Sequence, residues 1–242
     1  MFLRHFIFSK EIDLIGSSNK LNRDAWISKV LSEIPPGMKI LDAGAGKMPY
    51  KPFCSHLNYT SQDFCEYDGR GNGSGLQTET FDTNRIDIVS DIAHIPVSDN
   101  YYDVILCSEV LEHVPDAVKV MKELIRLLKP EGLLIVTVPF CSLTHYAPYH
   151  FASGFNRYFF ESFKDSLKID VLQTNGNYFE YLAQEIKRIP YVTGKYSSVR
   201  IGRVQNFFIY GLLNILARIN KRSSNSDELL CFGYHFIGKK LV

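Results

Sequence analysis

The chain has 242 residues, and 27 lysines and arginines balance 26 aspartates and glutamates, so its formal net charge is +1 at pH 7. This length is typical of one α/β domain with a sizeable core. The charge balance excludes a general attraction to nucleic acid or to an anionic membrane. The five cysteines form no C-x-x-C pair, and residues 1–10 lack the long apolar region of a secretory signal. We therefore expect a cytoplasmic protein without a bound metal.

Helices and strands alternate along the first half of the chain. Apolar residues such as Trp26, Val30 and Leu31 recur at helical spacing, and Pro35 ends the pattern. Short apolar runs are typical of buried strands. The predicted elements are a helix at 20–33 and strands at 38–42, 59–64, 86–89 and 102–107.

The second half continues this alternation and then changes character. The predicted elements are a helix at 116–128, strands at 133–138 and 168–172, a mostly helical segment at 178–222 and a closing strand or hairpin at 229–241. Strands that alternate with helices indicate a parallel α/β sheet. We expect one domain over 1–242, divided into an N-terminal helical segment (1–37), a cofactor-binding core (38–176) with an acceptor loop (139–161), a helical insertion (177–226) and a closing strand (227–242).

Four of the predicted strands end in acidic or polar residues, which are Asp42, Asp63, Asp91 and the pair Ser108 and Glu109. In an open parallel sheet, ligands bind outside the carboxyl ends of the strands. A carboxylate such as Asp63 can accept hydrogen bonds from both hydroxyls of a ribose, and carboxylates near the first strand suit cationic amino and sulfonium groups. The strand ends therefore predict a site for an uncharged or cationic nucleoside.

A glycine turn follows the first strand directly. Gly44 and Gly46 let the backbone turn tightly and approach a ligand where a Cβ atom would collide. A third glycine would complete the dinucleotide fingerprint, but Pro49 occupies that position. The pattern therefore disfavours a pyrophosphate cradle, and a nicotinamide-dependent oxidoreductase becomes the less favoured enzyme class.

Five segments resemble, in the same order, the motifs of class I S-adenosylmethionine-dependent methyltransferases. Residues 40–46 resemble the first motif, 62–64 the ribose-binding acidic motif, 90–92 the adenine-contacting motif, 102–114 the fourth-strand segment and 127–132 the turn before the fifth strand. The resemblance covers residues 26–176 and the final strand. Residues 47–49 depart from the Thr-Gly continuation of many relatives.

The resemblance implies a doubly wound, Rossmann-like fold with a mostly parallel seven-stranded sheet, an antiparallel closing strand and a helical insertion before it. It implies methyl transfer to an oxygen or nitrogen of a small-molecule or sugar-type acceptor, as in polysaccharide or small-metabolite modification. The implied cofactor is S-adenosylmethionine. The implied cofactor-binding residues are Asp42, Ala43, Gly44, Ala45, Gly46, Asp63, Phe64, Asp91, Ile92, Ser108 and Glu109.

The segment 139–161 is aromatic and follows the fifth predicted strand, where acceptor loops of this fold enter. His145 and His150 are the candidate general bases for a hydroxyl acceptor, although two histidines in such a loop can instead hydrogen-bond the backbone. His113 lies just before a helix, and we do not assign it as a base because closing that loop explains it equally well. The residues expected to contact the acceptor are Tyr146, Tyr149, Asn156 and Arg157.

Another kind of function remains open. The chain can be a non-catalytic nucleoside-binding or scaffold protein in which residues 178–222 dock a partner. The apolar run 207–217 is shorter than the roughly 20 residues that span a bilayer. We expect this run to pack in a core or a dimer, with peripheral membrane contact through 207–222 as the alternative. The sequence identifies neither the acceptor nor the oligomeric state.

Overall fold

The computed structural model describes residues 11–242, so the first ten residues of the predicted N-terminal segment lie outside the described residues. The chain forms two compact units. The larger unit comprises residues 23–173 and 233–242, and the smaller unit comprises 174–232 together with the described residues up to Asn22. The smaller unit thus contains all of the segment that the sequence predicts as a helical insertion.

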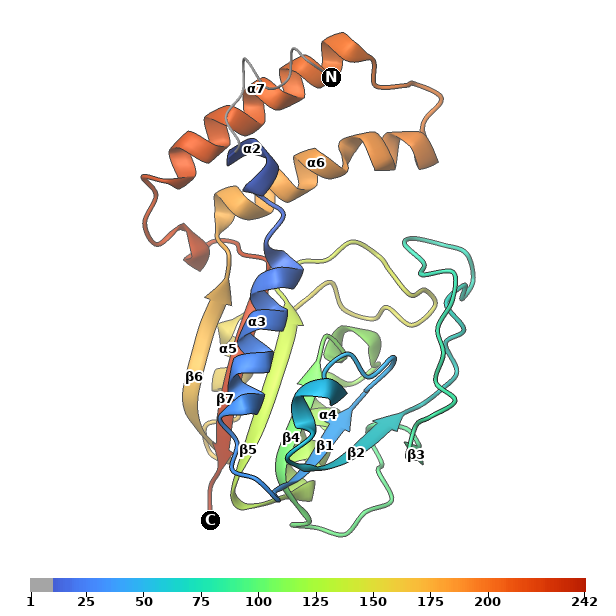
Figure 1. The fold of residues 1–242 in the computed structure, drawn as a ribbon, viewed down its shortest axis with the longest axis vertical. Coiled ribbons are helices and arrows are strands. Elements are labelled where there is room, and N and C mark those ends of the chain that lie inside the picture. The colour runs from blue at the N-terminus through green and yellow to red at the C-terminus, as the bar shows by residue number, and fades with distance from the viewer. Residues whose placement is uncertain (1–10) are drawn as a thin grey trace. The chain divides into compact units, whose positions relative to one another are not determined.

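Seven strands form one sheet in the order β3-β2-β1-β4-β5-β7-β6 (Figure 1). The strands are β1 (Lys39–Ala43), β2 (Asn58–Asp63), β3 (Ile88–Val89), β4 (Tyr102–Ser108), β5 (Leu128–Pro139), β6 (Leu167–Asn175) and β7 (Gly233–Lys240). Strands β1 to β5 pair in parallel, whereas β7 pairs antiparallel with β5. This arrangement confirms the predicted doubly wound α/β fold with an antiparallel closing strand.

Helices cover both faces of this sheet. The helix α3 (Asn19–Ser32) packs on one face, and α4 (Ala117–Leu127) lies on the other (Figure 1). The core beneath α3 contains Ile27, Leu31, Ile40, Val104, Leu106 and Ile135. The helix α4 begins at Asp116, whose carboxylate accepts a hydrogen bond from the backbone N–H of Lys119. The remaining short helices of the larger unit are η1 (Lys51–Cys54), η2 (Leu111–His113) and α5 (Arg157–Glu161).

The strand β5 begins earlier than the sequence predicts. The sequence assigns residues 129–132 to a turn before the strand, whereas the structure starts β5 at Leu128. The pairing of β4 with β5 is irregular between Tyr102 and Val104, and Glu131 has a φ of 65°. An irregularity of this kind takes up extra residues and tolerates a proline that cannot donate to the ladder.

The smaller unit contains the predicted helical insertion, α6 (Tyr178–Tyr196) and α7 (Arg203–Asn220), with the short α2 (Glu11–Leu14) and η3 (Ser226–Glu228). Its core is formed by Ile12, Ile15, Ala183, Ile186, Leu213, Leu216 and Ala217. The helix α7 also exposes large apolar side chains, namely Phe208, Leu212, Ile215 and Ile219. Within residues 11–242, no helix combines the length and the apolar character that a membrane crossing needs.

Candidate functional site

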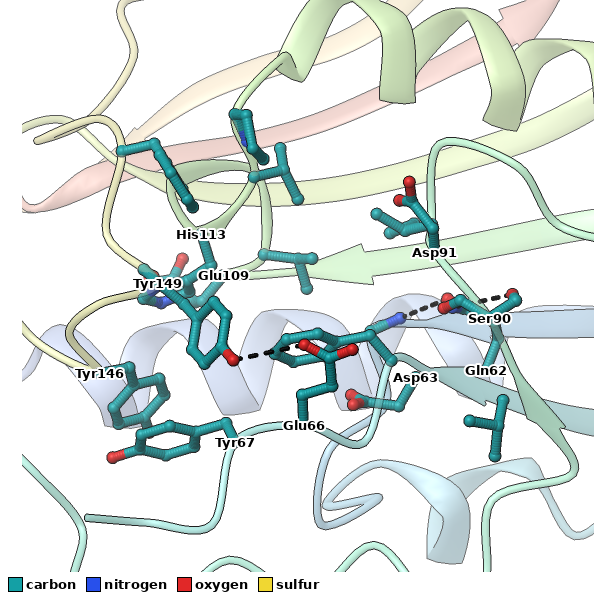
Figure 2. A pocket seen from close by; sticks show the side chains of 18 of the residues that line it. Gln62, Asp63, Glu66, Tyr67, Ser90, Asp91, Glu109, His113, Tyr146 and Tyr149 are labelled. Atoms are coloured by element: carbon teal, nitrogen blue, oxygen red, sulfur yellow. Dashed lines mark hydrogen bonds between the residues drawn. The ribbon is translucent and has the colours of Figure 1, made fainter. Parts of the chain in front are cut away.

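A cavity of about 570 Å³ lies at the carboxyl ends of β1, β2 and β4 (Figure 2). This volume falls within the roughly 300–1,000 Å³ typical of small-molecule and cofactor sites. The loops after these strands and the segment after β5 form its walls, which is where the doubly wound fold places its ligands. Its polar lining residues are Gln62, Asp63, Glu66, Ser90, Asp91, Glu109 and His113.

The glycine turn after β1 forms one wall of this cavity. Gly44 has a φ of +71°, and a Cβ atom there would lie 2.5 Å from a methyl carbon of Val110, so the position requires glycine. Three successive amides of the turn donate hydrogen bonds to the end of β2. They join Gly44 N to Gln62 Oε1 at 3.2 Å, Ala45 N to Gln62 O at 2.8 Å and Gly46 N to Asp63 Oδ2 at 3.0 Å. The turn therefore has these three amides already paired and does not present them to a phosphate.

Asp63 lies at the end of β2, where it lines the cavity although its side chain is nearly buried. One carboxylate oxygen accepts the hydrogen bond from Gly46 N, and the other accepts one from Cys65 N at 2.9 Å. A carboxylate offers about four lone-pair positions. Each oxygen therefore keeps capacity for a ligand hydroxyl while the backbone fixes its orientation.

Asp42 lies beneath the glycine turn and is not among the lining residues of the cavity. Its carboxylate is 3% exposed and accepts a hydrogen bond from the Tyr59 hydroxyl at 2.6 Å. Burial raises the pKa of Asp42 to about 6; the Tyr59 hydrogen bond opposes this shift, and the charge of Asp63 adds to it. Asp42 thus joins β1 to β2 inside the protein and does not face the cavity.

The two residues at the end of β4 have different surroundings. The Glu109 carboxylate lines the cavity and pairs with the Arg23 guanidinium at 2.7 Å. The Ser108 hydroxyl lies 2.8 Å from the Thr137 hydroxyl on β5 and does not line the cavity. Of the predicted cofactor residues, the cavity wall contains Gly44, Asp63, Phe64, Asp91, Ile92 and Glu109. The others lie behind it: Asp42, Ala43, Ala45, Gly46 and Ser108.

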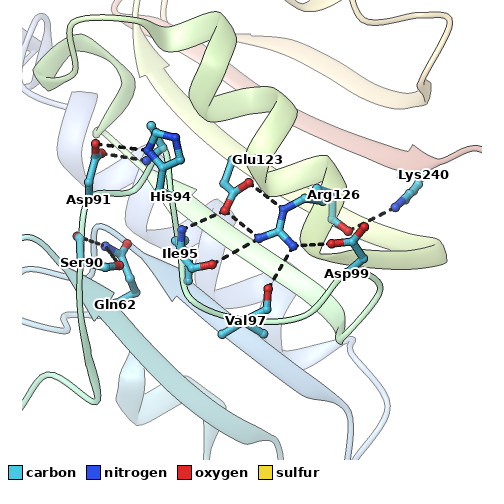
Figure 3. Close-up of polar contacts among 11 residues, drawn as sticks. Gln62, Ser90, Asp91, His94, Ile95, Val97, Asp99, Glu123, Arg126 and Lys240 are labelled. Atoms are coloured by element: carbon cyan, nitrogen blue, oxygen red, sulfur yellow. Dashed lines mark hydrogen bonds and ion pairs between the residues drawn. The ribbon is translucent and has the colours of Figure 1, made fainter.

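The loop at residues 90–99, which carries Asp91, is held by Arg126 of α4 (Figure 3). The guanidinium donates hydrogen bonds to the carbonyls of Ile95 and Val97 and to the carboxylates of Asp99 and Glu123. The other end of the loop is tied to β2, because the Gln62 side-chain amide donates to the Ser90 carbonyl at 2.6 Å. The loop is thereby fixed at both ends.

Aromatic rings form the opposite end of the cavity. The rings of Tyr67 and Tyr146 stack with their centroids 4.7 Å apart, and the Tyr149 hydroxyl donates to the Glu66 carboxylate at 3.3 Å. Figure 2 shows these side chains grouped together, away from Asp91. The predicted acceptor residues Tyr146 and Tyr149 therefore lie on the cavity wall.

The other two predicted acceptor residues lie elsewhere. The Asn156 side chain caps α5 by accepting a hydrogen bond from Tyr158 N at 3.1 Å. The Arg157 guanidinium pairs with the Glu161 carboxylate at 2.7 Å on the exposed side of the same helix. Neither residue lines the cavity.

His145 and His150 form a cluster with His113. One nitrogen of each lies within 4.8 Å of the others, and ring centroids are 4.5 Å apart for His113 and His145 and 4.9 Å for His145 and His150. Only His113 lines the cavity. The sequence contained a usable signal for this cluster, because His113 follows β4, the other two follow β5, and neighbouring parallel strands end at the same edge.

Glu112, to which the sequence analysis gave no role, lies against this cluster. Its side chain is 1% exposed, and its Oε1 is 3.7 Å from His113 Nε2 and 4.0 Å from His145 Nε2. Burial raises the pKa of Glu112, and the charge of Glu109 raises it further. Burial lowers the pKa of His113 to about 3, and the neighbouring imidazoles add to that effect. His113 is therefore neutral across the physiological range.

Comparisons with known proteins agree with this architecture. A family model described as a methyltransferase domain matches residues 19–193. Cycloartenol-C-24-methyltransferase 1 of Oryza sativa subsp. japonica is 31% identical over 124 residues, which span 48% of this chain and 34% of that protein. The matched part of the chain thus covers about a third of this curated relative.

Two solved structures share the fold over most of the chain. A SAM-dependent methyltransferase from Archaeoglobus fulgidus has a TM-score of 0.55 at 14% identity, covering 92% of this chain and 95% of that one. The cyclase SpnF has a TM-score of 0.53 at 15% identity, covering 90% and 80%. At these identities the likeness concerns the fold alone, and the cyclase is a reminder that one fold serves several reactions.

Proposed function

The chain belongs to the methyltransferase domain family, whose model matches residues 19–193, and from this premise we propose that it transfers a methyl group from S-adenosylmethionine to an oxygen or nitrogen of a small-molecule or sugar-type acceptor. The glycine turn carries the proposal. Its three amides donate to the end of β2, whereas a dinucleotide pyrophosphate needs such amides for itself. Carboxylates at the strand ends suit the ribose and the cationic groups of the sulfonium cofactor.

In this proposal the cofactor lies along the ends of β1, β2 and β4. Asp63, oriented by two backbone amides, accepts hydrogen bonds from the ribose hydroxyls. Asp91 and Ile92, on the loop held by Arg126, border the adenine. The methionine part of the cofactor then extends past Gly44, which lines the cavity.

Methyl transfer is an in-line displacement in which the S–CH₃ bond breaks as the acceptor oxygen or nitrogen forms its bond to carbon. Holding donor and acceptor collinear can contribute about 7–11 kcal/mol. The aromatic end of the cavity, with Tyr146 and Tyr149, is the proposed seat of the acceptor. A hydroxyl acceptor also loses a proton, which His145 or His150 is proposed to take, an effect of about 10²–10⁴ in rate.

One of the relatives supports the class of acceptor. The rice protein is named for methylation at C-24 of cycloartenol, which supports a small-molecule acceptor and leaves the atom open. A nucleoside-binding or scaffold protein without turnover is the alternative, since the fold alone does not determine the reaction.

Calorimetry with the full chain tests the proposal. We expect S-adenosylmethionine and S-adenosylhomocysteine to bind with micromolar affinity and NAD not to bind. Binding of NAD without binding of either sulfonium-derived ligand would overturn the proposal. Transfer of a labelled methyl group to small molecules that copurify with the protein, identified by mass spectrometry, would name the acceptor. Cofactor binding without transfer to any acceptor would favour the nucleoside-binding alternative.

The exposed face of α7 supports contact with another apolar surface. Phe208 is 70% exposed and Ile215 is 52% exposed, and Arg218, Lys221 and Arg222 lie near the end of the same helix. Packing against a second copy of the chain and peripheral contact with an anionic membrane are both consistent with this face. Sedimentation of the protein with and without anionic vesicles separates the two.

A further inference from the structure

The histidine cluster contains hydrogen-bond acceptors that face one another. The Nδ1 atom of His113 contacts the Tyr149 carbonyl, and the Nδ1 atom of His145 contacts the Leu143 carbonyl at 2.8 Å. A carbonyl oxygen only accepts, so both Nδ1 atoms must carry the proton. In a neutral imidazole the Nε2 atom then has no proton and carries a lone pair. Both Nε2 atoms are the ones that lie near Glu112 Oε1.

Several buried atoms around this point have no hydrogen-bond partner within the described residues. Neither Glu112 oxygen has a hydrogen-bond partner there, and the same holds for His113 Nε2 and for both ring nitrogens of His150. The Glu112 carboxylate is 1% exposed, so water does not compensate from outside. Buried polar atoms without partners are rare because each costs free energy. Several lone pairs converging on one point are the surroundings that a cation requires.

We propose that His113, His145 and His150 bind a divalent transition-metal ion, with the Glu112 carboxylate beside it. Three imidazoles suit zinc and its first-row neighbours, and three protein ligands leave a coordination position open. Histidine ligands of metals usually donate their second ring nitrogen to a carbonyl or carboxylate, as His113 and His145 do. The sequence analysis expected no metal because the cysteines lack metal spacing, but these histidines come from two separate loops.

The geometry is close to that of a closed site. The three candidate ligand atoms lie within 4.8 Å of one another, whereas tetrahedral zinc with Zn–N bonds of about 2.0–2.1 Å places its nitrogens about 3.4 Å apart. Small side-chain rotations bring them together. Of the three histidines, His113 lines the cavity, so the proposed metal site adjoins that cavity. A histidine that binds the ion has no lone pair left to accept a proton, so in the metal-loaded protein the ion, which lowers the pKa of a bound hydroxyl, takes the place of the histidine base. This consequence rests on the proposed function, whereas binding of the ion does not.

The test is zinc binding by the full chain after removal of metals with a chelator. Equilibrium dialysis with metal analysis is expected to give one tightly bound Zn²⁺ per chain, and Co²⁺ is expected to give the intense visible bands of tetrahedral coordination. His113→Gln is expected to weaken zinc binding at least about 100-fold, since even indirect partners of a metal contribute 10–100-fold. The matched control is His94→Gln, because the His94 side chain is 67% exposed and lies outside the cluster.

Equal zinc binding by the wild type and His113→Gln, or a loss that follows His94→Gln, would overturn the metal site. If His113→Gln does not fold, His150→Gln replaces it, because neither ring nitrogen of His150 makes a hydrogen bond that the substitution would break. Calorimetry with S-adenosylmethionine is run in parallel. If the protein binds the cofactor but not zinc, only the metal site is contradicted. If it binds zinc but not the cofactor, only the proposed function is contradicted.

Discussion

The strand-end wall of the cavity and the histidine cluster differ in how far their polar groups are hydrogen-bonded. At the strand-end wall, formed by Gly44, 62–63 and 90–92 with the rest of the glycine turn behind it, the turn amides pair with Gln62 and with the Asp63 carboxylate. In the histidine cluster, formed by His113, His145 and His150 with Glu112, several acceptors have no partner among the described residues. A wall whose groups are already paired is preorganised for a ligand that adds hydrogen bonds to it. Buried acceptors such as the Glu112 carboxylate and His113 Nε2 gain a partner when a cation or a proton donor enters.

The largest expected effect breaks the strand-end wall. Asp63→Ala removes the acceptor of Gly46 N and Cys65 N together with the proposed ribose contact. Charge-assisted hydrogen bonds of this kind contribute about 1.5–3 kcal/mol, so we expect affinity for S-adenosylmethionine to fall up to about 100-fold by calorimetry. Asp165→Ala, at an exposed carboxylate outside the cavity, is the control. Unchanged affinity in a folded Asp63→Ala protein would restrict Asp63 to supporting the turn.

A smaller effect concerns Asp42, which lies buried behind the same wall, and the free energy of unfolding. The pKa of Asp42 is raised to about 6 from an ordinary value of 3.8. Between these values the folded protein binds more protons than the unfolded chain, so the free energy of unfolding declines as the pH rises through that window. Above pH 6 the charged Asp42 carboxylate then lowers the free energy of unfolding by about 2–3 kcal/mol. Asp42→Asn removes this charge and keeps an acceptor for the Tyr59 hydroxyl.

We therefore expect Asp42→Asn to be more stable than the wild type by about 2 kcal/mol at pH 8, with a smaller difference at pH 5. Denaturant unfolding at both pH values measures it. Tyr59→Phe serves as the matched variant, since it removes the hydrogen bond and leaves the charge in place. A stability difference that does not change with pH would show that burial does not disfavour the charged form of Asp42 in the folded state.

The strand-end wall was largely predictable from sequence because it is local. Each strand and the residue that ends it are adjacent in the chain, so motifs at Gly44, Asp63 and Asp91 identify positions that the sheet then brings to one edge. What the motifs do not distinguish is whether a side chain faces the cavity or supports it from behind. Asp42 belongs to the first motif, yet it is buried under the turn.

The histidine cluster was not predictable to the same degree. Its members come from the loops after β4 and β5, and their mutual distances depend on loop paths that no periodicity determines. His113 and Glu112 follow β4 and were interpreted as loop residues or as part of a motif. Asn156 and Arg157 have side chains that suit an acceptor site. In the structure, however, Asn156 caps α5 and Arg157 forms an ion pair along that helix. The early start of β5 was not predicted because Pro130 and Gly132 are typical of a turn.

The smallest expected effect tests how firmly the strand-end wall is held from a distance. Arg126 joins α4 to the loop at 90–99 through three partners in the loop, the Ile95 and Val97 carbonyls and the Asp99 carboxylate (Figure 3). Its fourth partner, Glu123, lies on α4 itself. In Arg126→Met the loop loses these hydrogen bonds while the apolar part of the side chain is kept. Because the guanidinium touches no part of the cavity wall, its loss acts only through the position of Asp91 and Ile92. We expect affinity for S-adenosylmethionine to fall about 5-fold, equivalent to about 1 kcal/mol.

Arg126→Lys separates charge from geometry in this experiment. A lysine keeps the positive charge, but its compact ammonium cannot bond two carbonyls and two carboxylates at once, so it is expected to restore little of the affinity. Hydrogen exchange at Ile95 N, which donates to the Glu123 carboxylate at 2.8 Å, reports the loop directly and is expected to quicken in both variants. Faster exchange with full cofactor affinity would show that the loop does not border the adenine. Unchanged exchange would show that the tie between Gln62 and Ser90 holds the loop without Arg126.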